Sequence, residues 1–144
     1  MYKPNIFSLT KIILLITFDN SKVVKPEKIA LTVNFLSVVS SALVILFLFW
    51  SITLLLRKIY NINDKKSSTN IFLSAIIGSL AYTFSDSFWY NAVESEVYAL
   101  AMFFLAATFW LGLRWEKDFD TERGDRWLVL ISFMIGLSFG VHFM

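Results

Sequence analysis

Cysteine is absent from this chain of 144 residues, and histidine occurs only once, at His142. The chain therefore forms no disulfide, and it has no thiolate metal ligand and no cysteine nucleophile. Only 17% of the residues are charged and the net charge is +2, so no broad basic surface is available for nucleic acid. The sequence also has no glycine-rich phosphate loop, no HExxH and no G-x-S-x-G. These absences exclude many soluble enzyme classes.

Long apolar runs dominate what is present. Hydrophobic residues make up 57% of the chain, and the mean hydropathy is +0.65. A helix needs about 20 apolar residues to cross the hydrocarbon core of a membrane. We therefore expect an all-α fold, a polytopic transmembrane helix bundle of about four spans. The predicted spans are residues 30–56, 71–90, 97–113 and 127–144.

The first 28 residues differ from the rest. Their apolar stretch, from Ile12 to Phe18, lies between Lys11 and Asp19 and is too short to span a membrane. We predict an N-terminal interfacial helix and lead-in over residues 1–28, followed by a transmembrane region over residues 29–144. Because the last predicted span is still apolar where the sequence stops, we expect the chain to be an internal fragment.

Lysine and arginine are unevenly divided between the predicted loops. The loops after the first and third spans carry four basic residues each, whereas the loop between the second and third spans has none. Three lysines before the first span oppose this pattern but are fewer. Cytoplasmic loops are enriched in Lys and Arg, so we place the base-free loop on the outer face of the cytoplasmic (inner) membrane. The basic loop residues are Arg57, Lys58, Lys65, Lys66, Arg114, Lys117, Arg123 and Arg126.

The base-free loop is acidic and aromatic. Residues 85–99, SDSFWYNAVESEVYA, contain the carboxylates Asp86, Glu94 and Glu96 and four aromatic rings. This combination suits a sugar, whose C–H faces stack on rings and whose hydroxyls donate to carboxylates. Two other interpretations stay open. The acids are also typical of a solvated helix start, and the aromatic residues are also typical of an interfacial belt.

Two further residues are expected at a similar depth. At about 1.5 Å per residue, Asp86 and His142 each lie roughly 23 Å along their predicted spans. Charge near hydrocarbon is costly and often functional, although Asp86 could simply mark the water boundary and His142 could serve packing. In the last span, Gly136 and Gly140 form a GxxxG pattern, which predicts a helix-packing surface.

Two segments resemble a known family. Residues 81–100, AYTFSDSFWYNAVESEVYAL, and residues 125–144, DRWLVLISFMIGLSFGVHFM, resemble a bacterial multi-pass membrane family catalogued as domain of unknown function 2723. That family is related to transmembrane O-mannosyltransferases and is similar to the GT-C glycosyltransferases. The resemblance extends from about residue 7 onward. Its most specific part is the W-x-x-x-x-E-x-E-V-Y block at residues 89–98.

The resemblance implies transfer of a sugar, with mannose expected, from a polyprenyl-phosphate donor to a protein hydroxyl. Carried over to this chain, Glu96 and Glu94 are the catalytic residues that orient acceptor or sugar. No cofactor is required by the residues, and a divalent cation is left open. The expected partners are the lipid bilayer, the lipid-linked donor and a protein acceptor, with no nucleic acid. The expected substrate-binding residues are Trp89, Tyr98, Asn91, His142 and Asp86.

One departure from the family concerns catalysis. Such proteins carry an acidic outward loop ahead of the matching region, and this sequence shows no such motif. We therefore expect the 144 residues alone to be inactive.

Two functions of other classes compete with the transferase. In a transporter, the carboxylates and His142 would form a proton or cation path, but the inner halves of the predicted spans have no ionisable residue to continue it. In a non-catalytic membrane scaffold, the GxxxG surface would bind a neighbouring helix.

The predicted orientation can be tested with Asn91→Cys, which creates the only cysteine in the chain. We expect a membrane-impermeant thiol reagent to label this variant in intact cells, because Asn91 lies in the base-free loop. Arg123→Cys, in a basic loop, is the control and should react only after the cells are opened. The reverse labelling pattern would contradict the orientation.

Overall fold

The computed structural model describes residues 26–60, 65–93, 98–121 and 123–142, and within these ranges all regular structure is helical. The all-α class is thus confirmed for this part of the chain. Residues 1–25, which hold most of the predicted interfacial helix, lie outside the described residues. The helices are α2 (Pro26–Ile59), α3 (Lys65–Thr83), α4 (Asp86–Val93), α5 (Tyr98–Asp118) and α6 (Gly124–His142).

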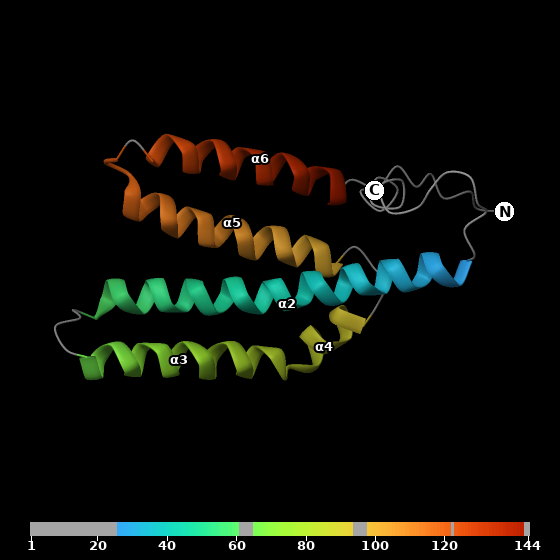
Figure 1. Cartoon of the computed structure of the whole chain (residues 1–144), viewed down its shortest axis with the longest axis horizontal. Helices are drawn as coiled ribbons and strands as arrows, with labels where there is room; N and C mark the ends of the chain where they lie inside the picture. The colour runs from blue at the N-terminus through green and yellow to red at the C-terminus, as the bar shows by residue number, and fades with distance from the viewer. Residues whose placement is uncertain (1–25, 61–64, 94–97, 122, 143–144) are drawn as a thin grey trace.

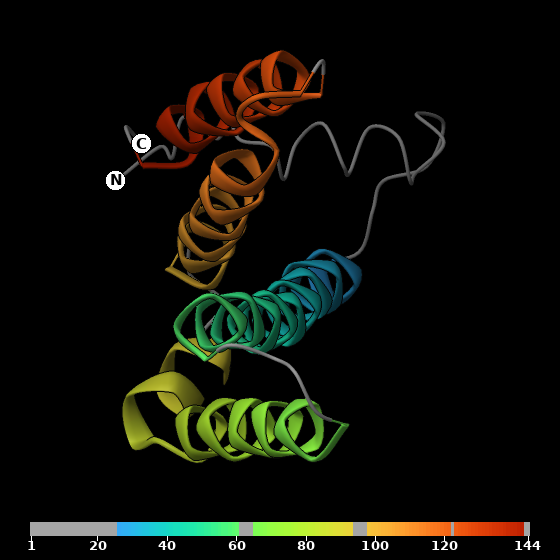
Figure 2. The ribbon, with the colours of Figure 1, turned by 90° about the vertical axis from the view of Figure 1, so that its left-hand side faces the viewer.

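Helix α2 is the central element. It packs against α3 and α4 on one side and against α5 on the other, and α6 packs on the outer side of α5. The four long helices therefore form an open row in the order α3, α2, α5, α6, with successive helices antiparallel except α2 and α5 (Figures 1 and 2). An open row leaves broad apolar surfaces exposed, including Leu31, Phe35, Ile77 and Phe133. This arrangement suits surroundings of lipid or of further protein.

The length of α2 follows from its composition. Its only proline is Pro26, at the first helical position, where the missing N–H costs nothing, and it contains no glycine. Its buried face, among the described side chains, consists of Val44 and four small residues, Ser37, Ser40, Ser41 and Ser51. Across the interfaces, α3 presents Ala75 and α5 presents Ala107, which are 0% and 1% exposed. Small side chains on both partners let helix backbones approach closely in an apolar environment.

The structure supports a membrane protein but not a definite number of spans. Two of the described helices are long and apolar enough to cross a bilayer, at Leu31–Ile59 and Tyr98–Asp118. A third span is obtained only if the bent segments Ser67–Thr83 and Asp86–Ala92 are counted together. The predicted count of four is therefore not confirmed. The helices also extend beyond the predicted apolar spans into charged residues, since α3 begins at Lys65 and α5 continues to Asp118.

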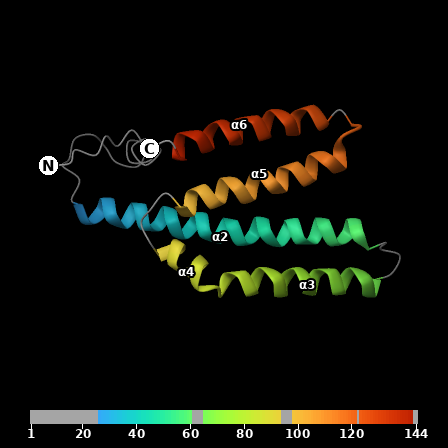
Figure 3. The same cartoon turned by 180° about the vertical axis from the view of Figure 1, so that it is seen from behind.

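The predicted basic loops meet at one end of the row. The end of α2, the start of α3, the end of α5 and the start of α6 lie together there, and α4 and the start of α5 lie toward the other end (Figures 1 and 3). The basic end includes Arg57, Lys58, Arg114, Lys117 and Arg126. The row of helices is therefore polarised along its length.

The glycines divide into packed and open positions. A Cβ at Gly78 would lie 3.2 Å from Ile52 Cδ1 of α2, so this glycine serves close packing of α3. A Cβ at Gly124 would lie 2.9 Å from the Phe119 carbonyl oxygen, and the tight turn between α5 and α6 thus requires glycine. Apart from the adjacent backbone of α6 itself, no described atom lies within 4 Å of a Cβ built at Gly136 or Gly140. The predicted GxxxG packing surface has no neighbour within the described chain.

Candidate functional site

The segment predicted as one span over residues 71–90 is instead two helices bent by 68°. Ser85 causes the break. Its backbone N–H and its hydroxyl both donate to the Tyr82 carbonyl oxygen, at 3.1 and 2.8 Å, and so end α3. The Ser85 carbonyl and hydroxyl oxygens then accept from the N–H groups of Trp89 and Phe88, at 3.0 and 3.4 Å. Ser85 therefore acts as the N-cap of α4, for which serine is a favoured residue.

Helix α4 is held against the row by one aromatic side chain. Phe88 is 8% exposed, and its ring packs on Tyr82 of α3 with a centroid distance of 5.0 Å. Helix α4 also contacts α2 and the start of α5. The bend after α3 and the packing of Phe88 together place α4 beneath α2 (Figure 1).

Four of the predicted site residues lie on α4 or at the start of α5. Asp86 is the first residue of α4 and is exposed, and Asn91 in its last turn is half-buried. Trp89 is 64% exposed and Tyr98, the first residue of α5, is 51% exposed. Their exposure leaves these side chains accessible to a ligand, and it equally fits an interfacial aromatic belt.

The remaining predicted residues are not described at the level of side chains. Glu94 and Glu96 lie in residues 94–97, outside the described residues. His142 is the last residue of α6, and only its backbone is described. Helix α6 ends toward the same end of the row as α4, but α2 and α5 lie between the two helices (Figures 1 and 2). The roles given to these three residues stay predictions.

A metal site is not formed by the described residues, among which no group of three His, Asp or Glu side chains is close enough to hold an ion.

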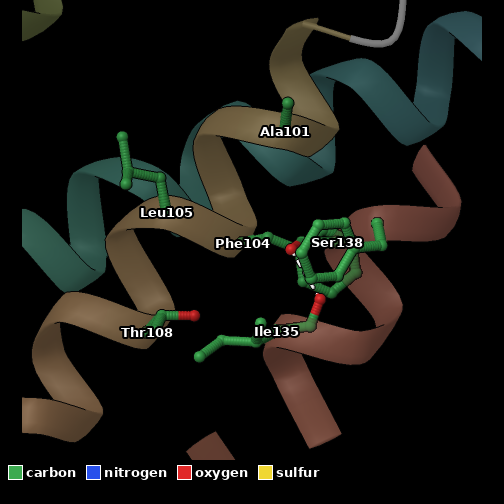
Figure 4. Close-up of a pocket in the computed structure, with 7 residues that line it drawn as sticks. Ala101, Phe104, Leu105, Thr108, Ile135 and Ser138 are labelled. Atoms are coloured by element: carbon green, nitrogen blue, oxygen red, sulfur yellow. Dashed lines mark hydrogen bonds between the residues drawn. The ribbon is translucent and has the colours of Figure 1, made fainter. Parts of the chain in front are cut away.

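A groove runs between α5 and α6 in the half of the row nearest Tyr98. Its volume is about 360 Å³. In Figure 4, Thr108 from α5 and Ile135 from α6 point into the space between the two helices. The Ser138 hydroxyl donates to the Ile135 carbonyl oxygen at 2.7 Å, so it is used within its own helix. The groove is lined by Ala101, Phe104, Leu105, Thr108, Ile135, Ser138 and Phe139.

A tryptophan cluster at the other end of the row was not predicted. The ring of Trp110 on α5 packs against Trp50 of α2 at 5.4 Å and against Trp127 of α6 at 6.3 Å. The Arg114 guanidinium lies 5.9 Å from the Trp110 ring centre and 5.5 Å from that of Trp127. Trp127 Nε1 donates to Asp118 Oδ2 at 3.0 Å. The i, i+4 spacing of Trp110 and Arg114 in the sequence indicates a cation–π contact on one helix face. The other partners come from distant parts of the chain, so no local pattern predicts them.

Comparison with known proteins identifies one family. The family model described as "Protein O-mannosyl-transferase TMEM260 N-terminal domain" matches residues 11–144. No curated protein and no solved structure matches the chain.

The role of Phe88 as the anchor of α4 can be tested with Phe88→Ala. We expect a loss of about 1–3 kcal/mol in unfolding free energy, below the 3–5 of soluble cores because lipid also solvates an apolar ring. Unfolding in a mixed-micelle denaturant titration measures it. Phe84→Ala is the matched control, because Phe84 is 81% exposed. Equal losses in the two variants would contradict the anchoring role.

Proposed function

We propose that this chain, which belongs to the family of the protein O-mannosyl-transferase TMEM260 N-terminal domain, holds the lipid-linked sugar donor of a membrane glycosyltransferase. The match over residues 11–144 is the observation that carries the glycosyltransferase-like role. It also confirms the relation to O-mannosyltransferases that the sequence indicated. The membership of the bacterial family, the donor, the acceptor and the membrane face go beyond this match and belong to the proposal.

The groove between α5 and α6 supports a polyprenyl-phosphate donor. A polyprenyl chain is long, slim and apolar, and the groove is lined mainly by apolar side chains. The groove occupies the first half of α5, which begins at Tyr98. A chain bound there would bring its phosphate and sugar toward the end of the row that carries Trp89 and Tyr98, where rings are available to stack on a sugar.

The proposed reaction is a single displacement at the sugar. The acceptor hydroxyl oxygen of a protein forms a bond to C1 of mannose while the bond from C1 to the phosphate oxygen breaks. The polyprenyl phosphate leaves with the bonding electron pair, and the hydroxyl proton passes to the carboxylate of the acidic outward loop that such proteins carry ahead of the matching region. Glu96, and with it Glu94, orients the acceptor or the sugar, and His142 contacts the donor phosphate. One displacement inverts the configuration at C1.

The polarity of the row supports an outward-facing site. The basic residues gather at one end, and such residues favour the cytoplasmic side of a membrane. In the proposal, α4 and the start of α5 then lie at the outer face of the cytoplasmic membrane.

The catalytic proposal predicts that Glu96→Gln lowers mannose transfer by about 100-fold, because a misplaced acceptor loses this order of rate. The measurement is the transfer of mannose from polyprenyl-phosphate mannose to a serine- and threonine-rich peptide. The protein is isolated from the membranes of the organism that naturally produces it. Asp120→Asn is the control, since Asp120 is an exposed turn residue at the opposite end. Unchanged transfer by Glu96→Gln would remove its catalytic assignment.

The donor groove is tested separately by photocrosslinking. A benzophenone side chain at Thr108 should crosslink polyprenyl-phosphate mannose, and excess unlabelled polyprenyl phosphate should suppress the product. The control position is Phe72, which is 52% exposed on α3 away from the groove. Equal crosslinking at both positions would show general lipid contact and would contradict a donor groove.

A further inference from the structure

A second pocket lies between α2 and α5 at the basic end of the row. Its volume is about 510 Å³, and its wall comes from the last turns of both helices. Leu54, Leu55 and Leu113 form an apolar part of the wall. Four basic residues, Arg57, Lys58, Arg114 and Lys117, and one acid, Glu116, form the polar part. The lining is therefore amphipathic, with a strong excess of positive charge.

The single acid leaves most of this charge uncompensated. Glu116 Oε1 accepts from Lys58 Nζ in an ion pair whose side chains are both more than half exposed. Among the described residues, this is the only ion pair on the pocket wall. Arg57, Arg114 and Lys117 thus supply three positive charges to one concave site without an acidic partner there.

Arg114 is held in place by the tryptophan cluster. Its guanidinium lies within 6 Å of both the Trp110 and Trp127 ring centres, and Asp118 fixes Trp127 by accepting from its indole N–H. The Arg114 Nε is buried, and no described group accepts its hydrogen. The buried Nε is therefore closed to a ligand, and an anion in the pocket would contact the rest of the Arg114 guanidinium group.

Basic residues at helix C-termini have a simpler explanation, because they are favoured by the helix dipole and by cytoplasmic topology. Cytoplasmic topology also explains the exposed Arg123 and Arg126, although they lie at the start of α6 rather than at a helix C-terminus. It does not account for a concave pocket lined by both basic residues and leucines. Nor does it account for an arginine whose guanidinium lies near two tryptophan rings.

We propose that this basic pocket binds the headgroup of an anionic phospholipid. Arg57, Arg114 and Lys117 contact the phosphate, and the three leucines contact the upper part of the acyl chains. Arginine offers paired donors that match phosphate oxygens, and basic pockets between membrane helices are known to take anionic headgroups. The pocket is separate from the donor groove, and its ligand is a structural lipid of the bilayer rather than the sugar donor.

The test uses the full chain in lipid nanodiscs and its own tryptophan fluorescence. Bromine on lipid acyl chains quenches tryptophans in contact with them. The Trp110 ring lies 5.9 Å from the guanidinium of Arg114, which lines the pocket, and Trp50 packs on Trp110. Brominated phosphatidylglycerol is titrated into phosphatidylcholine discs, and brominated phosphatidylcholine gives the reference. We expect the unmodified chain to prefer phosphatidylglycerol. In R57Q/K117Q this preference should fall by about tenfold, because two phosphate contacts are lost.

The matched control is R123Q/R126Q, which removes the same charge from exposed residues at the same end but outside the pocket. We expect its preference for phosphatidylglycerol to change less than about twofold. An equal fall in the preference for phosphatidylglycerol in both double variants, or no fall in R57Q/K117Q, would overturn the proposal that this pocket binds the lipid. Inorganic phosphate is added as a competitor, and displacement of the quenching by it would overturn the assignment to a lipid. Helix content from circular dichroism confirms that all variants fold.

Discussion

The close approach of neighbouring helices to α2 is the constraint on which the rest of the structure depends. Between membrane helices, lipid is as apolar as the protein, so association relies on packing contact rather than on release of water. The small buried side chains of Ser37, Ser40, Ser41 and Ser51 on α2, together with the buried Ala75 of α3 and Ala107 of α5, allow that close contact. Large side chains at these positions would separate α3 and α5 from α2. The two pockets exist because α5 is fixed by α2 on one side and carries α6 on the other.

Local chemistry decides where the functional end is placed. Ser85 donates to the Tyr82 carbonyl near the end of α3 and accepts from the N–H groups of Phe88 and Trp89 in α4, so these backbone groups stay paired where the chain turns by 68°. Phe88 then fixes the new direction by packing on Tyr82. A straight helix would have carried Trp89 and Tyr90 further along the axis of α3. The bend instead brings α4 beneath α2 and near the start of α5, where the aromatic side chains can act together.

The sequence predicted the helical class and the family relation better than it predicted the boundaries and the bend. Apolar runs are sufficient to indicate membrane helices, but helical hydrogen bonding continues past them, so α3 begins at Lys65 and α5 ends at Asp118. The Ser-Asp-Ser sequence at residues 85–87 was an available N-cap signal that the apolar pattern obscured. The contact of Arg114 with Trp127 could not be read from spacing, because it depends on how α6 packs on α5. The roles of Glu94, Glu96 and His142 stay predictions.

The two proposed lipid sites are connected through α5. This helix has 21 residues, which at about 1.5 Å per residue gives about 31 Å, close to the roughly 30 Å of a bilayer hydrocarbon core. The groove uses Ala101 to Thr108, and the basic pocket uses Leu113 to Lys117. A headgroup bound by Arg114 and Lys117 would fix the depth of one end of α5 in the membrane. Tyr98 lies 16 residues from Arg114 and 19 from Lys117, which is about 24–29 Å along the helix, so it would then lie near the opposite interface, where a polyprenyl-linked sugar leaves the apolar phase.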